Sequence, residues 1–444
     1  MILVAVDDLM LASKIRQAAA GCGIELDFPR SPAEIVERAR LGRPALVMFD
    51  LNSVRFAPLS TIGALKADPA LRAIPTLAFV SHVQADLIAE ARAAGVDRVL
   101  ARSAFFDKLP EILDETRAAA AASPEIGLRD VSRAHERIAP YVRRTPLVES
   151  EWLSSVAGAD VRLKLESLQV THSFKPRGMV NAALALIDRA SAGDKVAVVT
   201  ASAGNAGRAL AYAAERVGLH TIVFTPRGAP RAKLDAISRH GADLRAEADD
   251  YDDAERRAKV YAAAHGILYI SPFSHPDVIA GFGTIAMEVF EDFPGIDTYV
   301  VPVGGGGLIS GIGLAAKALS RAVRIVGVEV EASHPFAVSL REGRITGVTV
   351  GPSIADGLVG NLDPETITFD LVRRYVDELA QVSEDDLKEG IRGLVAHEHL
   401  IAEGAGIAGV AAALARRVDL KGRRVAIVVS GANIDVERLR QILA

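Results

Sequence analysis

Short apolar runs rich in β-branched residues alternate with amphipathic helical stretches along most of the chain. In the first part these runs occupy residues 2–6, 45–49, 76–80 and 98–101, and the helical stretches include residues 12–20 and 33–41. In the later part the runs occupy residues 196–200, 221–225, 299–303, 324–330 and 424–429. This alternation is typical of parallel sheets with helical crossovers, and it predicts an α/β fold throughout.

One interruption of the alternation separates two regions. At 444 residues the chain is too long for one ordinary domain. Residues 118–124 (AAAAASP) are typical of a frayed helix end followed by a breaker, and a polar stretch comes next. We therefore predict a first domain at residues 1–118, a linker at 119–128 and a second domain at 129–444.

Charge and composition exclude several classes of protein. The formal net charge is −5, which gives no electrostatic case for binding nucleic acid or an anionic membrane surface. The single cysteine, Cys22, excludes an intrachain disulfide and a cysteine cage for a metal. The start is not signal-like and no apolar run reaches membrane-spanning length, so we expect a cytoplasmic protein without a membrane partner.

The first motif with chemical content lies at residues 171–178 (THSFKPRG). It places Lys175 between an aromatic residue and a proline, which is unusual for a surface lysine. A buried lysine with a lowered pKa acts as an amine nucleophile toward an aldehyde. A solvated lysine at a turn is the alternative that this motif alone leaves open.

Two small-residue motifs each join an apolar strand to a helical stretch. Residues 200–207 (TASAGNAG) precede a helical stretch at 208–217, whose start would favour a carboxylate; a plain turn is the alternative. Residues 302–308 (PVGGGGL) contain four consecutive glycines, whose N–H groups can form an anion nest. The spacing matches neither the Walker A pattern nor the dinucleotide fingerprint, so a phosphate monoester is the predicted ligand.

The last motif, residues 429–433 (VSGAN), follows the final apolar run. In one interpretation Asn433 is the N-cap of a helix. In the other, Ser430 meets a heteroaromatic nitrogen.

In this order and spacing the four motifs resemble the fold-type-II pyridoxal-phosphate enzymes, specifically the threonine/serine dehydratase and serine racemase group. The resemblance spans roughly residues 129–444, and it includes residues 144–147 (RTPL), 164–166 (KLE), 278–284 (VIAGFGT) and 354–357 (IADG). It implies two α/β subdomains arranged as in tryptophan synthase β, the smaller at about residues 178–280. It also implies a homodimer or higher homo-oligomer.

The resemblance assigns a role to each motif. Lys175 would hold pyridoxal phosphate covalently and later act as the base at Cα of the substrate. Phe174 would lie beside the cofactor ring, Asn205 would bond its 3-hydroxyl, and Ser430 would face the pyridine nitrogen. The phosphate would be bound by Gly304, Gly305, Gly306, Gly307 and Leu308, and the substrate carboxylate by Ser202, Ala203, Gly204, Asn205 and Ala206.

These roles point to an amino-acid lyase. A neutral serine at the ring nitrogen favours prompt β-elimination over transamination, because it cannot stabilise a pyridinium as an aspartate would. The leading hypothesis is an L-threonine and/or L-serine ammonia-lyase that produces a 2-oxo acid and ammonia. The alternatives are a dehydratase of another β-hydroxy amino acid such as 3-hydroxyaspartate, an amino-acid racemase, and an amino-acid sensor without turnover.

Several positions depart from the family pattern. Ala206 stands where histidine is frequent, which bears on the geometry of the carboxylate loop, and Phe282 stands where glutamine is common, which bears on substrate choice. Ala203 stands where racemases carry a serine base, which argues against racemisation. Pro335 stands where an aspartate would join Glu329 in a divalent-metal site, so we expect no metal in the lyase domain.

The first domain resembles a response-regulator receiver, which implies a doubly wound, flavodoxin-like sheet. Asp7 and Asp8 follow the first apolar run and Asp50 ends a later one, so the three carboxylates could bind Mg²⁺, with Asp50 accepting a phosphoryl group. Arg102 replaces the family's lysine. The resemblance implies a histidine kinase or other signalling partner, and a docking role without phosphorylation is the alternative.

Overall fold

The computed structural model describes residues 1–22, 24–42, 44–68, 71–72, 74–81, 84–122, 126–190 and 196–444. The chain divides into two compact units, Met1–Arg129 and Asp130–Ala444. Helix α6 (Leu109–Ala122) includes residues 119–122 of the expected linker, which are therefore helical. Residues 123–125 of that linker lie outside the described residues, and helix α7 (Leu128–Ile138) begins at its end.

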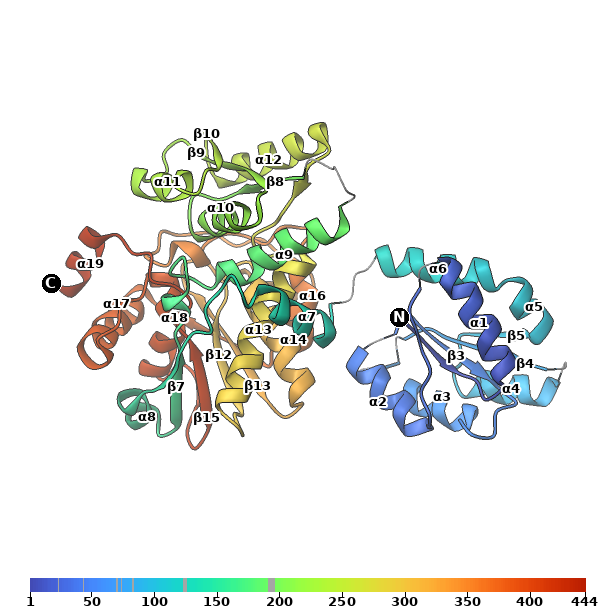
Figure 1. The fold of residues 1–444 in the computed structure, drawn as a ribbon. Coiled ribbons are helices and arrows are strands. Elements are labelled where there is room, and N and C mark those ends of the chain that lie inside the picture. The colour runs from blue at the N-terminus through green and yellow to red at the C-terminus, as the bar shows by residue number, and fades with distance from the viewer. Residues whose placement is uncertain are drawn as a thin grey trace. The chain divides into compact units, whose positions relative to one another are not determined.

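The first unit is a five-stranded parallel sheet with helices on both faces (Figure 1). Its strands, β1 (Ile2–Ala5), β2 (Leu26–Asp27), β3 (Leu46–Asp50), β4 (Thr76–Val80) and β5 (Arg98–Ala101), lie in the order β2-β1-β3-β4-β5. The other helices are α1 (Leu9–Cys22), α2 (Pro32–Gly42), α3 (Pro58–Ala67), α4 (Ala85–Ala93) and α5 (Arg102–Asp107). Alternate residues of each strand point to opposite faces, so one core forms against α2, α3 and α4 and the other against α1, α5 and α6.

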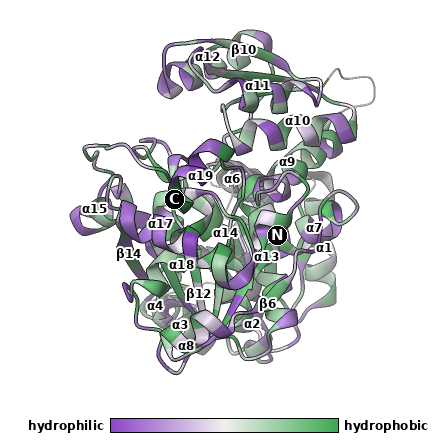
Figure 2. Ribbon diagram, turned by 90° about the vertical axis from the view of Figure 1, so that its left-hand side faces the viewer, coloured by the Kyte–Doolittle hydropathy of each residue, from purple (hydrophilic) through white to green (hydrophobic). Residues whose placement is uncertain are grey.

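The second unit contains two sheets. The larger has the order β14-β13-β12-β15-β7-β6, and only β6 is antiparallel to its neighbour. Its strands are β6 (Leu147–Glu149), β7 (Asp160–Lys164), β12 (Thr298–Pro302), β13 (Arg324–Val330), β14 (Glu378–Val382) and β15 (Arg424–Val428). The central strands are buried almost completely, and Figure 2 colours the region around β12 mainly as hydrophobic.

The smaller sheet is inserted in sequence between β7 and β12 of the larger one. It is fully parallel, in the order β10-β9-β8-β11. Its strands are β8 (Ala197–Ala201), β9 (His220–Pro226), β10 (Asp243–Ala248) and β11 (Leu268–Tyr269). The described helices of the second unit after α7 are α8 (Glu151–Ala157), η1 (Glu166–Leu168), α9 (Lys175–Arg189), α10 (Asn205–Val217), α11 (Arg231–Ser238), α12 (Tyr251–His265), α13 (Pro276–Asp292), α14 (Gly307–Leu319), α15 (Pro335–Glu342), η2 (Asp356–Leu358), α16 (Thr368–Tyr375), α17 (Glu384–Gly393), the π-helix η3 (Leu394–Glu398), α18 (Gly404–Leu414) and α19 (Val436–Leu443).

The predicted strands are present to within one or two residues at each end, while three features differ. The strands β2, β6, β7, β10, β11 and β14 were not predicted, because they are either very short or interrupted by charged residues and so carry little apolar signal. Helix α10 begins at Asn205, three residues before the predicted stretch. The interpretation of Asn433 as a helix cap is wrong, because the side chain of Asp435 caps α19.

Glycines let three helices of the second unit approach at backbone distance. A side chain at Gly281 of α13 would collide with the carbonyl oxygen of Arg177 on α9. A side chain at Gly311 of α14 would collide with the carbonyl oxygen of Ile279 on α13. The first turns of α9 and α14 are therefore held close to the same helix.

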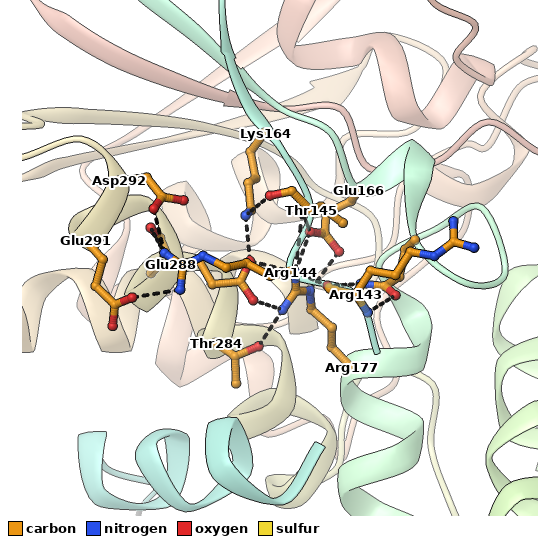
Figure 3. Close-up of polar contacts among 12 residues, drawn as sticks. Arg143, Arg144, Thr145, Lys164, Glu166, Arg177, Thr284, Glu288, Glu291 and Asp292 are labelled. Carbon is orange, nitrogen blue, oxygen red and sulfur yellow. Dashed lines mark hydrogen bonds and ion pairs between the residues drawn. The ribbon is translucent and has the colours of Figure 1, made fainter. Parts of the chain in front are cut away.

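A fully buried ion cluster joins α9, α13 and β7 (Figure 3). The Arg177 guanidinium donates to both carboxylate oxygens of Glu166 (2.8 and 2.9 Å) and of Glu288 (2.7 and 2.9 Å). Lys164 Nζ donates to Glu288 Oε2 at 2.5 Å and to the Thr145 carbonyl at 2.7 Å. Two cations thus face two anions, and the buried cluster carries little net charge.

The motifs RTPL (144–147) and KLE (164–166) supply several of the residues of this cluster. Thr145 donates its hydroxyl to Glu166 at 2.5 Å, so these motifs build the cluster. Burial would lower the pKa of Arg177, but Glu166 and Glu288 outweigh it and raise that pKa. Burial alone would raise the pKa of Glu288, which the adjacent Arg177 and Lys164 instead hold below its usual value.

We predict that Glu288→Gln lowers the free energy of unfolding by about 3–5 kcal/mol, because it leaves Lys164 without its carboxylate partner and two buried cations with only Glu166 as a counter-charge. The matched control is Glu291→Gln one turn further along α13, which removes an exposed ion pair with Arg144 and should cost about 0–1 kcal/mol. Urea unfolding of the two variants measures the difference. Equal losses would show that the buried cluster does not hold the helices together.

Candidate active site

Lys175 is the first residue of α9, and its amine lies among aromatic rings. The Nζ atom donates to the Pro272 carbonyl at 2.9 Å and lies 4.9 Å from the centre of the Phe174 ring and 5.6 Å from that of Phe282. Burial lowers the pKa of Lys175 to about 8, although the negative charge of Glu403 opposes this. The neutral fraction near neutral pH is therefore larger than that of an ordinary lysine, which suits attack on an aldehyde. The side chain is half-buried among these groups and not solvated at a turn.

We predict that Lys175, in protein freed of any cofactor, titrates near pH 8. Because the pKa is lowered, the reactive neutral amine should appear about two pH units below that of Nα-acetyl-lysine added to the same tube, whose pKa is roughly 10.4. Peptide mass spectrometry after brief acetylation at a series of pH values gives both curves. Superimposable curves would show that Lys175 is not in a desolvated site.

The four-glycine loop joins β12 to α14 and leaves its amides available. Among the described residues, no hydrogen bond acceptor is paired with the N–H groups of Gly304, Gly305, Gly306 or Gly307. Gly306 has φ +82°, in the left-handed region that favours glycine. A side chain at Gly305 would enter the Phe273 ring. The loop thus presents unpaired donors at a helix N-terminus, which suits a phosphate.

The loop and Lys175 are brought together by neighbouring residues of one segment. Pro272 accepts from the lysine amine, and Phe273 packs directly on the glycine loop. The structure therefore unites two of the predicted motifs.

The motif at 429–433 lies against the lysine motif. Phe174 N–H donates to the Ser430 carbonyl at 3.0 Å, and Ser173 forms a β-bridge with Gly431. Ser430 is buried. The hydroxyls of Thr171 and Ser173 are buried with no partner among the described residues, so the region has polar groups to offer a ligand.

The motif at 200–207 completes the set. Ser202 Oγ accepts from the N–H of Gly204 at 3.1 Å, which orders the turn before α10. Ala203 and Gly204 are half-buried and Ala206 is almost fully buried. The Asn205 side chain contacts Asn433 at 2.7 Å, so this motif meets the motif at 429–433.

Sequence reasoning missed Glu403, which precedes α18. Its Oε1 accepts from Asn205 Nδ2 at 2.6 Å. Burial raises the pKa of Glu403 to about 7, and Asp356 adds to the effect, while Asn205 and Lys233 oppose it. The signal was present, because Glu403 is the single charged residue in the apolar stretch 400–415.

Glu329, which would be a ligand of the family's divalent-metal site, instead binds the start of a helix. Its two carboxylate oxygens accept from the N–H groups of Phe336 and Ala337, both at 2.9 Å, at the start of α15. Burial raises its pKa to about 7 against these hydrogen bonds. Among the described residues no group of three or more His, Cys, Asp or Glu side chains is arranged to hold a metal ion.

The carboxylates of the first unit lie at the carboxyl ends of β1 and β3. Asp50 is buried, and its Oδ2 lies 3.5 Å from the guanidinium of Arg102. Burial raises the pKa of Asp50, Asn52 and Arg102 oppose this, and Asp7 and Asp8 add to it. Asp8 Oδ1 also accepts from the Met10 N–H at 2.8 Å, which caps α1.

The second unit therefore has the features of an enzyme that binds a phosphorylated aldehyde through a lysine. A desolvated primary amine, a cradle of unpaired amides and buried unpartnered hydroxyls fit pyridoxal phosphate.

Comparisons with known proteins agree with this class. A model of the pyridoxal-phosphate dependent enzyme family matches residues 138–431, so the chain belongs to that family. The L-threonine ammonia-lyase of Thermotoga maritima is 41% identical over 318 residues, which cover 72% of this chain and 78% of that protein. Maize serine racemase has a TM-score of 0.66 at 33% identity, with 71% of this chain and 95% of the racemase covered. Threonine deaminase isoform 2 from Solanum lycopersicum has a TM-score of 0.66 at 29% identity, with 71% and 92% covered.

In the part of the chain that the structure describes, none of the helices combines the length and the apolar character needed to cross a bilayer.

Proposed function

We propose that the second unit is a pyridoxal-phosphate-dependent lyase that eliminates water from L-threonine, and also from L-serine, to give a 2-oxo acid and ammonia. The observation that carries the proposal is the position of the Lys175 amine near the glycine loop. The amine binds the Pro272 carbonyl, and the next residue, Phe273, packs on the loop. The 41% identity to a protein described as an L-threonine ammonia-lyase supports the choice of reaction.

The cofactor, when bound, withdraws electrons from Cα of the amino acid. Lys175 holds it and then takes the proton from Cα, which its lowered pKa permits near neutral pH. The amides of Gly304 to Leu308 would bind its phosphate, Phe174 would lie beside its ring, and Ser430 would face its ring nitrogen. The turn from Ser202 to Ala206 orients the substrate carboxylate at the start of α10.

The bond changes balance without a further reagent. The Cα–H bond breaks toward Lys175, the Cβ–O bond breaks, and an equivalent of the proton taken up by Lys175 passes to the hydroxyl, which leaves as water. The neutral Lys175 amine would then retake its place on the aldehyde carbon, which frees the enamine. The released enamine becomes an imine, and water hydrolyses it to the 2-oxo acid and ammonia. Ala203 has no hydroxyl to return a proton on the opposite face, which favours elimination over racemisation.

We predict that the full-length protein releases ammonia and 2-oxobutanoate from L-threonine faster than it forms the D-enantiomer, without added Mg²⁺. Lys175→Ala should lose at least about 10²–10⁴-fold in rate and the visible absorbance of the bound cofactor. The matched control, Lys388→Ala on the exposed face of α17, should keep both.

A panel with L-serine, 3-hydroxyaspartate and the D-enantiomers decides between the alternatives. Faster racemisation than ammonia release would replace the lyase by a racemase. Cofactor binding without turnover of any substrate would indicate a sensor.

We also propose that the first unit is a flavodoxin-like receiver module. Its support is the strand order β2-β1-β3-β4-β5, which is that of flavodoxin-like sheets, and the buried Asp50 near Asp7 and Asp8. Mg²⁺ at these carboxylates would offset their repulsion, and phosphorylation by a signalling partner would compete with the contact between Arg102 and Asp50.

We predict that a small phosphodonor with Mg²⁺ adds one phosphoryl group to the intact protein, at Asp50. Asp50→Asn should abolish the added mass, and Asp107→Asn, an exposed aspartate at the end of α5, should not. Intact-protein mass spectrometry reads the result. No added mass on the unaltered protein would leave docking as the role of this unit.

A further inference from the structure

A row of side-chain hydrogen bonds holds Asn205 in place, and its other members have no role in the proposed reaction. Arg208 NH1 donates to Asn433 Oδ1 at 3.0 Å. Asn433 Nδ2 donates to Asn205 Oδ1 at 2.7 Å and to the Thr171 carbonyl at 2.9 Å. Asn205 Nδ2 in turn donates to Glu403 Oε1 at 2.6 Å.

The residues at the two ends of this row, Arg208 and Glu403, fix the direction in which each hydrogen bond is donated. An arginine guanidinium can only donate, so the oxygen of Asn433 must face Arg208 and its nitrogen must face Asn205. The oxygen of Asn205 is then turned toward Asn433, and its nitrogen toward the carboxylate of Glu403. An ionised carboxylate can only accept, so both ends favour the same direction.

With the hydrogen bonds in this direction, one N–H of the Asn205 amide remains without an acceptor among these side chains. Each amide nitrogen carries two hydrogens. Asn433 uses one on Asn205 and the other on the Thr171 carbonyl, with the His172 carbonyl also 3.5 Å from the same nitrogen, whereas Asn205 uses one, on Glu403. In the opposite direction the oxygen of Asn205 would face the oxygen of Glu403.

Glu403 is fixed from its own side. Its N–H donates to the Gly431 carbonyl at 3.0 Å, and a side chain at Gly431 would overlap the Glu403 carboxylate. The row of hydrogen bonds thus links α10, which packs on the smaller sheet, to two segments beside the larger sheet. One of these segments follows β15 and the other precedes α18.

We propose that Arg208, Asn433 and Glu403 are positioning residues that lock the amide of Asn205 with one N–H reserved for the ring oxygen of pyridoxal phosphate. The inference rests on the proposed function, because it needs the cofactor to lie against Asn205. Arg208 and Glu403 act through Asn205 and not on the substrate.

The decisive variant is Asn433→Asp. The introduced aspartate accepts from Arg208 as the asparagine does, but it cannot donate to Asn205. Its carboxylate and that of Glu403 then compete for the Asn205 nitrogen, so the amide loses its single direction and its free N–H. Cofactor-free protein titrated with pyridoxal phosphate above pH 7, where Glu403 is ionised, should bind at least about ten-fold more weakly, with a shifted visible band.

The matched control is Asn361→Asp. The Asn361 side chain makes similar hydrogen bonds to the N–H and carbonyl of Val348, outside the site, and the same change there should leave cofactor affinity and spectrum unchanged. Arg208→Lys retains a donor-only cation and should stay close to the unaltered protein. Arg208→Met removes the anchor and should weaken binding in the same direction as Asn433→Asp.

The outcomes separate the inference from the proposed function. Unaltered affinity and spectrum in both Asn433→Asp and Arg208→Met would overturn the inference. A lower unfolding midpoint with normal cofactor affinity would do so too, because it would show a purely structural role. If the unaltered protein binds no pyridoxal phosphate, the proposed function fails first. Should Asn433→Asp not fold, the comparison of Arg208→Met with Arg208→Lys decides.

Discussion

The ion cluster around Arg177 is the interaction on which the second unit depends. It lies at zero or near-zero exposure and ties α9 to α13 and to the end of β7. A buried cluster of this kind gains little over apolar packing, but it is costly to unbalance, so it enforces one arrangement of the three elements. Lys175 lies two residues before Arg177, and the arrangement therefore fixes the position of the reactive amine.

The site is assembled from the ends of strands and the starts of helices. The glycine loop follows β12 and begins α14, the turn after β8 begins α10, and Lys175 begins α9. Helix N-termini present unpaired N–H groups and favour negative charge. The proposed sites for a phosphate and a carboxylate would therefore need few cationic side chains, and burial lowers the pKa of the Lys175 amine close to them.

Much of the fold followed from local patterns. The strands at residues 76–80, 98–101 and 324–330 were predicted with the bounds that the structure has, because short apolar runs between helical stretches mark strands clearly. The start of α10 was missed by three residues, since a turn rich in glycine and alanine has no clear boundary in sequence. The cap at Asp435 was mistaken for Asn433 because both residue types cap helices.

The sequence by itself determined the chemistry of the second unit: a lysine in an apolar motif, four consecutive glycines and a serine after the last strand are informative because few other uses justify them. It could not determine what surrounds them. The pairing of Arg177 with Glu166 and Glu288 joins residues up to 111 positions apart, and the contact of Asn205 with Glu403 spans 198. Such contacts depend on how helices pack across sheets, and hydrogen-bond direction depends on which donor and acceptor meet there. Only the tertiary structure decides either one.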